Sequence, residues 1–150
     1  MSKALDMADL IRNRILTRSA VGELATTVDL THIEVIIDRQ TPVLSLIQAA
    51  VGKATGTAIV ILWQGFRVLD KHTARPRLAQ SYNISVWSKQ VIDGDNRPAD
   101  NVIESIVLRL WQWVPDGGHS YGEAEVSNGD MVPNKSFLIY DCEVVIPTTL

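Results

Sequence analysis

The stretch from Arg97 to Val114, RPADNVIESIVLRLWQWV, is the clearest amphipathic helix in the sequence and sets the expected fold class. Pro98 suits a first helical turn, because its missing N–H has no partner there within the helix. At about 100° per residue, Trp111 and Trp113 fall at opposite edges of one apolar stripe. The other members of the stripe recur at helical spacing, at Val102, Ile103, Ile106, Val107, Leu110 and Val114. A helix of this kind needs an apolar surface of similar length, which neighbouring strands can supply.

Length and composition predict a single globular domain over residues 1–150. The chain is 46% hydrophobic and 21% charged, which is enough for a real core. A formal net charge of -3 gives no overall argument for binding nucleic acid or an anionic membrane. The single cysteine, Cys142, rules out an internal disulfide framework and fits a reducing compartment. Charges break up the N-terminal apolar residues, so we expect no signal peptide, and the run Ala58 to Trp63 is too short to span a bilayer.

The remaining elements follow from hydrophobic periodicity and turn residues. Helical spacing predicts further helices at Ala4 to Thr17 and Thr41 to Val51. Strands are expected at His32–Asp38, Thr57–Leu69, Gln80–Lys89, His119–Ser127 and Ser136–Ile146. Asp70 to Leu78 is expected to form an exposed loop, and Asn128-Gly129-Asp130 a turn. Strands joined by turns favour antiparallel pairing, so we expect an α+β fold: a mixed, mostly antiparallel sheet of four to five strands with two to three helices packed on it.

The strand patterns also predict burial. Ala58 to Trp63 shows no alternation, which indicates that both of its faces are covered, and Gly65 marks a bulge or a close backbone approach. Clear alternation predicts two further apolar faces. The first consists of Tyr82, Ile84 and Val86, and the second of Leu138, Tyr140, Cys142, Val144 and Ile146.

Residues that carry chemistry do not form a recognisable motif. His32, His72 and His119 are scattered, without a second ligand at metal-binding spacing. Cys142 alternates with apolar neighbours and is better interpreted as a core residue than as a nucleophile. The segment Asp93 to Asn96 lacks the closing glutamate of a calcium loop, and no phosphate loop or nucleophile elbow is present. We therefore expect no catalytic, metal-binding or cofactor-binding residues, and a protein that is not an enzyme.

Two groups of residues are candidates for interfaces. The segment from Arg67 to Arg77 also carries Lys71 and Arg75, with Asp70 as its one acidic residue, which makes it a positive patch in an acidic chain. Two interpretations stay open: a solvated loop that protects an edge strand, or a contact with an acidic partner or DNA phosphates. Trp111 and Trp113 have the same ambiguity, because each either closes the core or faces outward as an interface anchor.

The order of the expected elements and their residue composition resemble those of a known family. A strand rich in Ile, Val and Trp (AIVILWQGFRV) follows an N-terminal helix, and a long polar loop leads to an alternating strand (YNISVWSK). A helix with a leucine-rich end (NVIESIVLRLWQW) and a final strand (FLIYDCEVVI) complete the chain. Over roughly Ala4 to Ile146, this looks like the small tail terminator proteins, also called tail-completion or minor tail proteins, of long-tailed bacteriophages and prophages, including the Mu-like group.

The resemblance implies a structural, non-enzymatic virion protein, located in the virion tail and, during assembly, in the bacterial cytoplasm. Such proteins form a ring, typically of six copies, that caps the tail tube and joins it to the head connector. Contact with passing DNA is a further expectation. Ring contacts are heterologous, so two different faces must complement each other. The basic loop and the acidic strand face at Asp141 and Glu143 are candidates for opposite faces. The alternatives are a small monomeric or dimeric binding module for a peptide or apolar ligand, and a small hydrolase or transferase.

Overall fold

The computed structural model describes residues 3–16, 33–37, 47, 57–70, 74–89, 98–115, 121–133 and 137–150. Within these ranges the elements are α1 (Lys3–Leu16), β1 (Glu34–Ile37), β2 (Thr57–Asp70), β3 (Arg77–Lys89), α3 (Pro98–Leu110), β4 (Glu125–Pro133) and β5 (Phe137–Thr149). The expected α+β class is confirmed. The predicted helix over Thr41 to Val51 lies outside the described residues except for Ile47, which is helical and buried.

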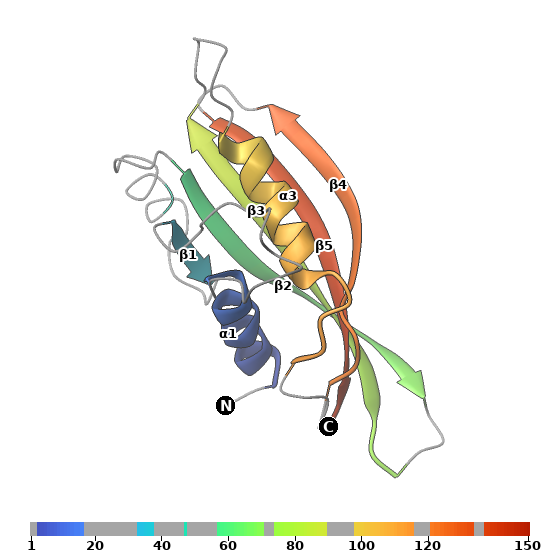
Figure 1. The fold of residues 1–150 in the computed structure, drawn as a ribbon. Coiled ribbons are helices and arrows are strands. Elements are labelled where there is room, and N and C mark those ends of the chain that lie inside the picture. Colours follow the sequence, from blue (N-terminus) through green and yellow to red (C-terminus); the bar gives the residue numbers. More distant parts are fainter. Residues whose placement is uncertain are drawn as a thin grey trace.

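The five strands form one sheet in the order β1-β2-β3-β5-β4 (Figure 1). Only β1 and β2 run parallel, and the other three pairs are antiparallel. Both described helices pack on the same face of the sheet, α1 mainly over β1 and β2 and α3 over β3 and β5. The mixed, mostly antiparallel sheet expected from the sequence is therefore present, and β3 is its central strand, between β2 and β5.

The main core lies between the helices and this face of the sheet. Its central rows are the alternating residues Tyr82, Ile84 and Val86 of β3 and Cys142, Val144 and Ile146 of β5, as predicted. The sequence also placed Tyr140 on this face, and its side chain packs against the core while remaining partly exposed. The helices contribute the following buried side chains: Met7, Ala8, Ile11, Ile15, Val102, Ile106 and Leu110. A smaller cluster, formed by Ile36, Ile47, Ala58 and Val60 with Trp87 against it, lies on the opposite face of the sheet.

Two arginines join the C-terminal ends of the helices. Arg14 Nε donates to the Arg109 carbonyl at 2.8 Å, and the Arg109 guanidinium donates to the Ile15 carbonyl. Arg109 is 2% exposed, although its position in α3 did not mark it as a core residue. The last carbonyls of a helix carry partial negative charge and have no partner within the helix, so cationic donors there stabilise both helix ends.

Helix α3 ends at Leu110, four residues before the predicted end at Val114. Gln112 adopts a left-handed backbone with φ of 54°, and the Trp113 N–H donates to the Leu110 carbonyl at 3.2 Å. A left-handed residue just beyond the last turn is a common helix terminator. Trp111 and Trp113 therefore follow the helix and do not lie on its stripe, which corrects the expected helical placement of this pair.

Two assignments, one of a loop and one of a turn, also change. Arg77 and Leu78, expected in a loop, begin β3 because the C-terminal end of β5 pairs with them at Thr149 and Thr148. Asn128 to Asp130, expected as a turn, lies within β4 at a register shift between Ser127 and Gly129. Pairing with a neighbouring strand thus overrides the local preference of these residues for a turn. In β4 the register shift accommodates one extra residue as a bulge.

The bulge predicted at Gly65 is present. The register of β2 against β3 shifts between Trp63 and Gly65, and Gly65 has φ of 111°. The expectation that Ala58 to Trp63 is covered on both faces holds up to Ile61 only. Leu62 and Trp63 are exposed, because β1 pairs with β2 no further than Ile61.

Candidate interaction surfaces

The first surface is the far half of the β2–β3 hairpin, which projects beyond the helices (Figure 1). We call it the hairpin end and define it as residues 62–70 with residues 75–78. Its large apolar side chains are between 39% and 58% exposed, namely Leu62, Trp63, Phe66, Val68 and Leu69. One hydrogen bond orders this group, from Trp63 Nε1 to Gln80 Oε1 at 2.8 Å. Single exposed apolar residues are ordinary, but five on one strand indicate a contact surface.

The hairpin end is also basic. Arg67 in β2 and Arg77 at the start of β3 are exposed, and Arg75 is exposed in the connection between the strands. Arg67 lies opposite Ala79, so its side chain and that of Arg77 share the face of the sheet that points away from the helices. The structure therefore brings Arg67, Arg75 and Arg77 together, whereas Lys71 lies outside the described residues.

The second surface is acidic and lies on β4 and β5, at the opposite edge of the sheet from β1. Asp130 of β4 is directly opposite Asp141 of β5, and Glu143 follows two residues along on the same face. Glu125 at the start of β4 adds a fourth carboxylate near Glu143. We call these four residues the acidic edge. Like charges directly opposite each other on neighbouring strands are unfavourable, so a cationic partner would stabilise this edge.

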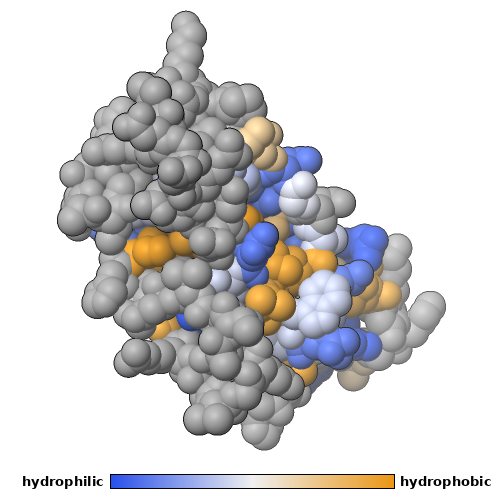
Figure 2. Space-filling model, turned by 45° about the horizontal axis from the view of Figure 1, so that its top comes forward, coloured by the Kyte–Doolittle hydropathy of each residue, from blue (hydrophilic) through white to orange (hydrophobic). Residues whose placement is uncertain are grey.

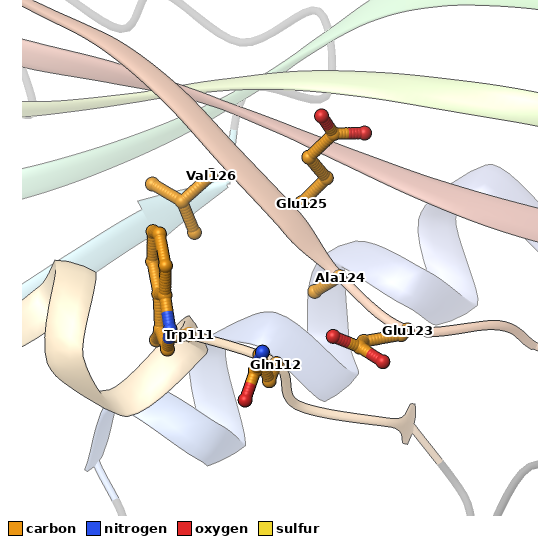
Figure 3. Close-up of a pocket in the computed structure, with 6 residues that line it drawn as sticks. All are labelled: Trp111, Gln112, Glu123, Ala124, Glu125 and Val126. Atoms are coloured by element: carbon orange, nitrogen blue, oxygen red, sulfur yellow. The ribbon is translucent and has the colours of Figure 1, made fainter.

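The third surface is a hollow where the chain leaves α3 and enters β4. The Ala124 N–H donates to the Trp113 carbonyl at 2.7 Å, which ties the segment before β4 to the segment after α3. The hollow between them has a volume of about 420 Å³ (Figure 3). It is lined by Trp111, Gln112, Glu123, Ala124, Glu125 and Val126.

The two tryptophans have different environments. Trp113 is half-buried and packs against the main core. Trp111 is 58% exposed and lines the hollow. Figure 2 looks onto the helix-bearing side and shows hydrophobic side chains at the surface among hydrophilic ones. Of the two alternatives that the sequence left open, Trp113 therefore closes the core and Trp111 faces outward.

The acidic and basic residues predicted for opposite faces lie on the same face of the sheet. Asp141 and Glu143 are opposite Ser85 and Asn83 on the side away from the helices, which is also the side of Arg77. Arg77 pairs with Thr149, six residues along β5 from Glu143, which corresponds to about 20 Å at strand spacing. The prediction of opposite faces is therefore wrong. The acidic and basic residues share one face of the sheet and are separated along the strands.

Burial accounts for the pKa values that are shifted among the described residues, those of Cys142 and Tyr82. Loss of solvation raises the pKa of the Cys142 thiol to about 12, with a smaller contribution from neighbouring Asp141. Burial also raises the pKa of Tyr82, with a smaller contribution from Tyr121. Both groups belong to the main core, in agreement with the interpretation of Cys142 as a core residue.

The described residues contain neither a metal-binding cluster nor a helix that could span a membrane. No group of three or more His, Cys, Asp or Glu side chains in these ranges could hold a metal ion. The histidines His32, His72 and His119 lie outside the described ranges. Neither described helix combines the length and apolar character needed to cross a membrane.

Sequence reasoning missed the residues that complete the hollow and the hairpin end. The sequence predicts Glu123 within the strand His119–Ser127, and Phe66 and Val68 within the strand Thr57–Leu69, and marks none of the three for an interface. The sequence signal for Phe66 and Val68 is an apolar run in β2 longer than its neighbour β1 can cover, and Glu123 has no such signal. In comparisons with known proteins, no family model matches the chain and no curated sequence shows significant similarity to it.

Proposed function

We propose that this protein is a structural assembly protein that forms a closed homo-oligomeric ring, acting as a tail terminator in a phage or prophage tail. In this role it caps the tail tube and joins it to the head connector. The resemblance in element order supplies the biological role. Self-association is supported by one observation: the hairpin end and the β4 side of the sheet differ in charge, and both expose apolar side chains.

The two sides are suited to each other. The hairpin end combines exposed apolar residues with Arg67 and Arg77, neither of which has an ion-pair partner among the described residues. The β4 side combines the acidic edge with Trp111 and with Met131, which is also exposed. Interfaces typically have an apolar centre and complementary charges that steer the encounter. A hairpin end of one copy against the β4 side of the next meets both conditions.

This contact is heterologous and repeats from copy to copy. The hairpin end extends from β2, near one side of the sheet, whereas β4 is the last strand on the other side. One molecule can therefore bind two neighbours at once through different surfaces. Such contacts generate a ring when the rotation between copies closes, and a filament when it does not. A terminator requires the closed form.

The test is the oligomeric state, measured by light scattering and negative-stain imaging over a concentration series. The protein is studied alone and with assembled tail tubes of a long-tailed phage. We expect rings, at high concentration or on the tubes. Arg77→Glu should raise the concentration needed for half-assembly about tenfold, because it gives the hairpin end a charge of the same sign as the acidic β4 side of the next copy.

Arg12→Glu is the matched control. It makes the same charge change on α1, where Arg12 pairs with Asp9 at 3.8 Å across one helical turn. Exposed pairs of this kind contribute little to stability, and α1 belongs to neither surface, so assembly should be unchanged. A protein that stays monomeric both alone and with tubes would contradict the proposed function.

A second candidate function is a small binding module. The hollow beside Trp111 supports it, because its volume of about 420 Å³ falls within the range of ligand sites. This candidate predicts a monomer or dimer that binds a peptide or apolar ligand without forming rings. The same light-scattering series therefore separates the two functions.

A further inference from the structure

The hollow has the chemistry of a site for a planar cation. Trp111 supplies an exposed aromatic surface, and buried Ala124 with half-buried Val126 makes an apolar lining. Figure 3 shows the Glu123 carboxylate turned toward Gln112, whereas the Glu125 carboxylate points away from them. Glu123 has no ion-pair partner among the described residues. The hollow thus offers one ring face and one available carboxylate.

A guanidinium group fits this combination better than an ammonium group does. Its flat, weakly hydrated surface stacks on an indole, and its N–H groups bind a carboxylate in a forked arrangement. Lysine provides a point charge that stays strongly hydrated. The side-chain class that the hollow selects is therefore arginine.

Arg67 and Arg77 of the hairpin end cannot fill the hollow of their own molecule. Arg67 and Arg77 lie on the face away from the helices, whereas Val126 points to the helix face of β4 opposite Val144 of the core. The strands β3 and β5 separate β2 from β4, a span of about 14 Å at ordinary strand spacing. A second copy has no such restriction, because the hairpin end projects beyond the helices (Figure 1).

We propose that the Trp111–Glu123 hollow binds an arginine side chain, Arg67 or Arg77, from the hairpin end of a second copy of this chain. The proposal rests on the proposed function, since it names the contact that joins neighbouring copies in the ring. The arginine stacks on Trp111 and pairs with Glu123.

The experiment uses two variants of the full-length protein. The hairpin variant carries Arg67→Glu and Arg77→Glu and keeps an intact hollow. The hollow variant carries Trp111→Ala and Glu123→Ala and keeps an intact hairpin end. Trp111 and Glu123 are exposed, so neither substitution opens a cavity in the core. Each variant alone should need at least about tenfold more protein to assemble than the unchanged chain, because interface aromatic and charged anchors dominate affinity.

Mixing the two variants gives the decisive result. The intact hollow of the first can bind the intact hairpin end of the second. The hairpin end that carries glutamates and the hollow that lacks both Trp111 and Glu123 have no attraction for each other, so the mixture should form a 1:1 dimer that does not grow. Light scattering of the mixture against each variant alone detects this dimer. Val114→Ala is the matched control, because it removes an exposed apolar side chain in the same segment, outside the residues that line the hollow.

The outcomes separate the two proposals. A 1:1 dimer from monomeric variants supports the assigned contact. Rings that form normally in the hollow variant overturn the hollow as the contact and leave the ring function standing. An unchanged protein that remains monomeric, alone and with tail tubes, overturns the ring function and this contact with it.

Discussion

The two halves of strand β2 have similar composition and opposite environments. Ala58, Ile59, Val60 and Ile61 are buried, with β1 and β3 on either side and a hydrophobic cluster on each face. From Leu62 onward the same strand exposes large apolar side chains, because β1 has ended and the helices do not extend that far. The comparison teaches that one apolar run can supply both the core and a contact surface.

The largest expected difference between the halves is in stability. Ile61→Ala removes a side chain that is 0% exposed and should lower the free energy of unfolding by about 2–5 kcal/mol. Leu69→Ala removes an isomeric side chain that is 41% exposed and should cost less than about 1 kcal/mol. Urea unfolding followed by tryptophan fluorescence measures both values. Equal losses would show that the hairpin end is packed as tightly as the covered half.

The bulge that separates the two halves should have an intermediate effect. Gly65→Ala forces a side chain into a backbone with φ of 111°, although no atom lies within 4 Å, so the cost is conformational: about 1–3 kcal/mol. Gly129 in β4 is the matched control, because it lies at the second register shift without a positive φ. Gly129→Ala should change the free energy of unfolding by less than about 0.5 kcal/mol. The same urea titration compares them, and a neutral Gly65→Ala would contradict the assigned strain.

The smallest expected effect is a pH dependence of stability, which arises from a thiol buried beside the covered half of β2. Cys142 lies opposite Ile84, which lies opposite Ile61, and burial raises the pKa of its thiol from 9.0 to about 12. The unfolded chain therefore loses this proton first as pH rises. The buried, protonated thiol therefore contributes to the free energy of unfolding fully below pH 9, and this contribution is lost as pH rises from 9 toward 12. Between pH 8 and 10, the free energy of unfolding should fall by about 1 kcal/mol as a result.

Cys142→Ala isolates this contribution. The variant starts from a lower stability because it shortens a buried side chain, but its free energy of unfolding should fall less between pH 8 and 10 than that of the unchanged protein. Tyr82 also has a raised pKa and is present in both proteins, so its effect cancels in the difference. Identical pH slopes would mean that the thiol is accessible to solvent in the folded state.

Particular residues show how far the sequence could predict the candidate surfaces. The clustering of Arg67, Arg75 and Arg77 is local, since a hairpin keeps residues of neighbouring strands together. The hollow is not local, because the segment from Glu123 to Val126 is placed beside Trp111 by a hydrogen bond between Ala124 and Trp113. No periodicity carries information about such a contact.

The amino-acid sequence by itself determined the fold class, the apolar faces of β3 and β5, the helices α1 and α3 and the bulge at Gly65. These features follow from spacing of two or 3.6 residues and from backbone preference, which act over short stretches. Only the tertiary structure decided which part of β2 is covered, where α3 ends, why Arg109 is buried, and that Trp111 and Trp113 differ in exposure. Each of these depends on which distant segment reaches the site, and burial is set by that neighbour and not by the local pattern.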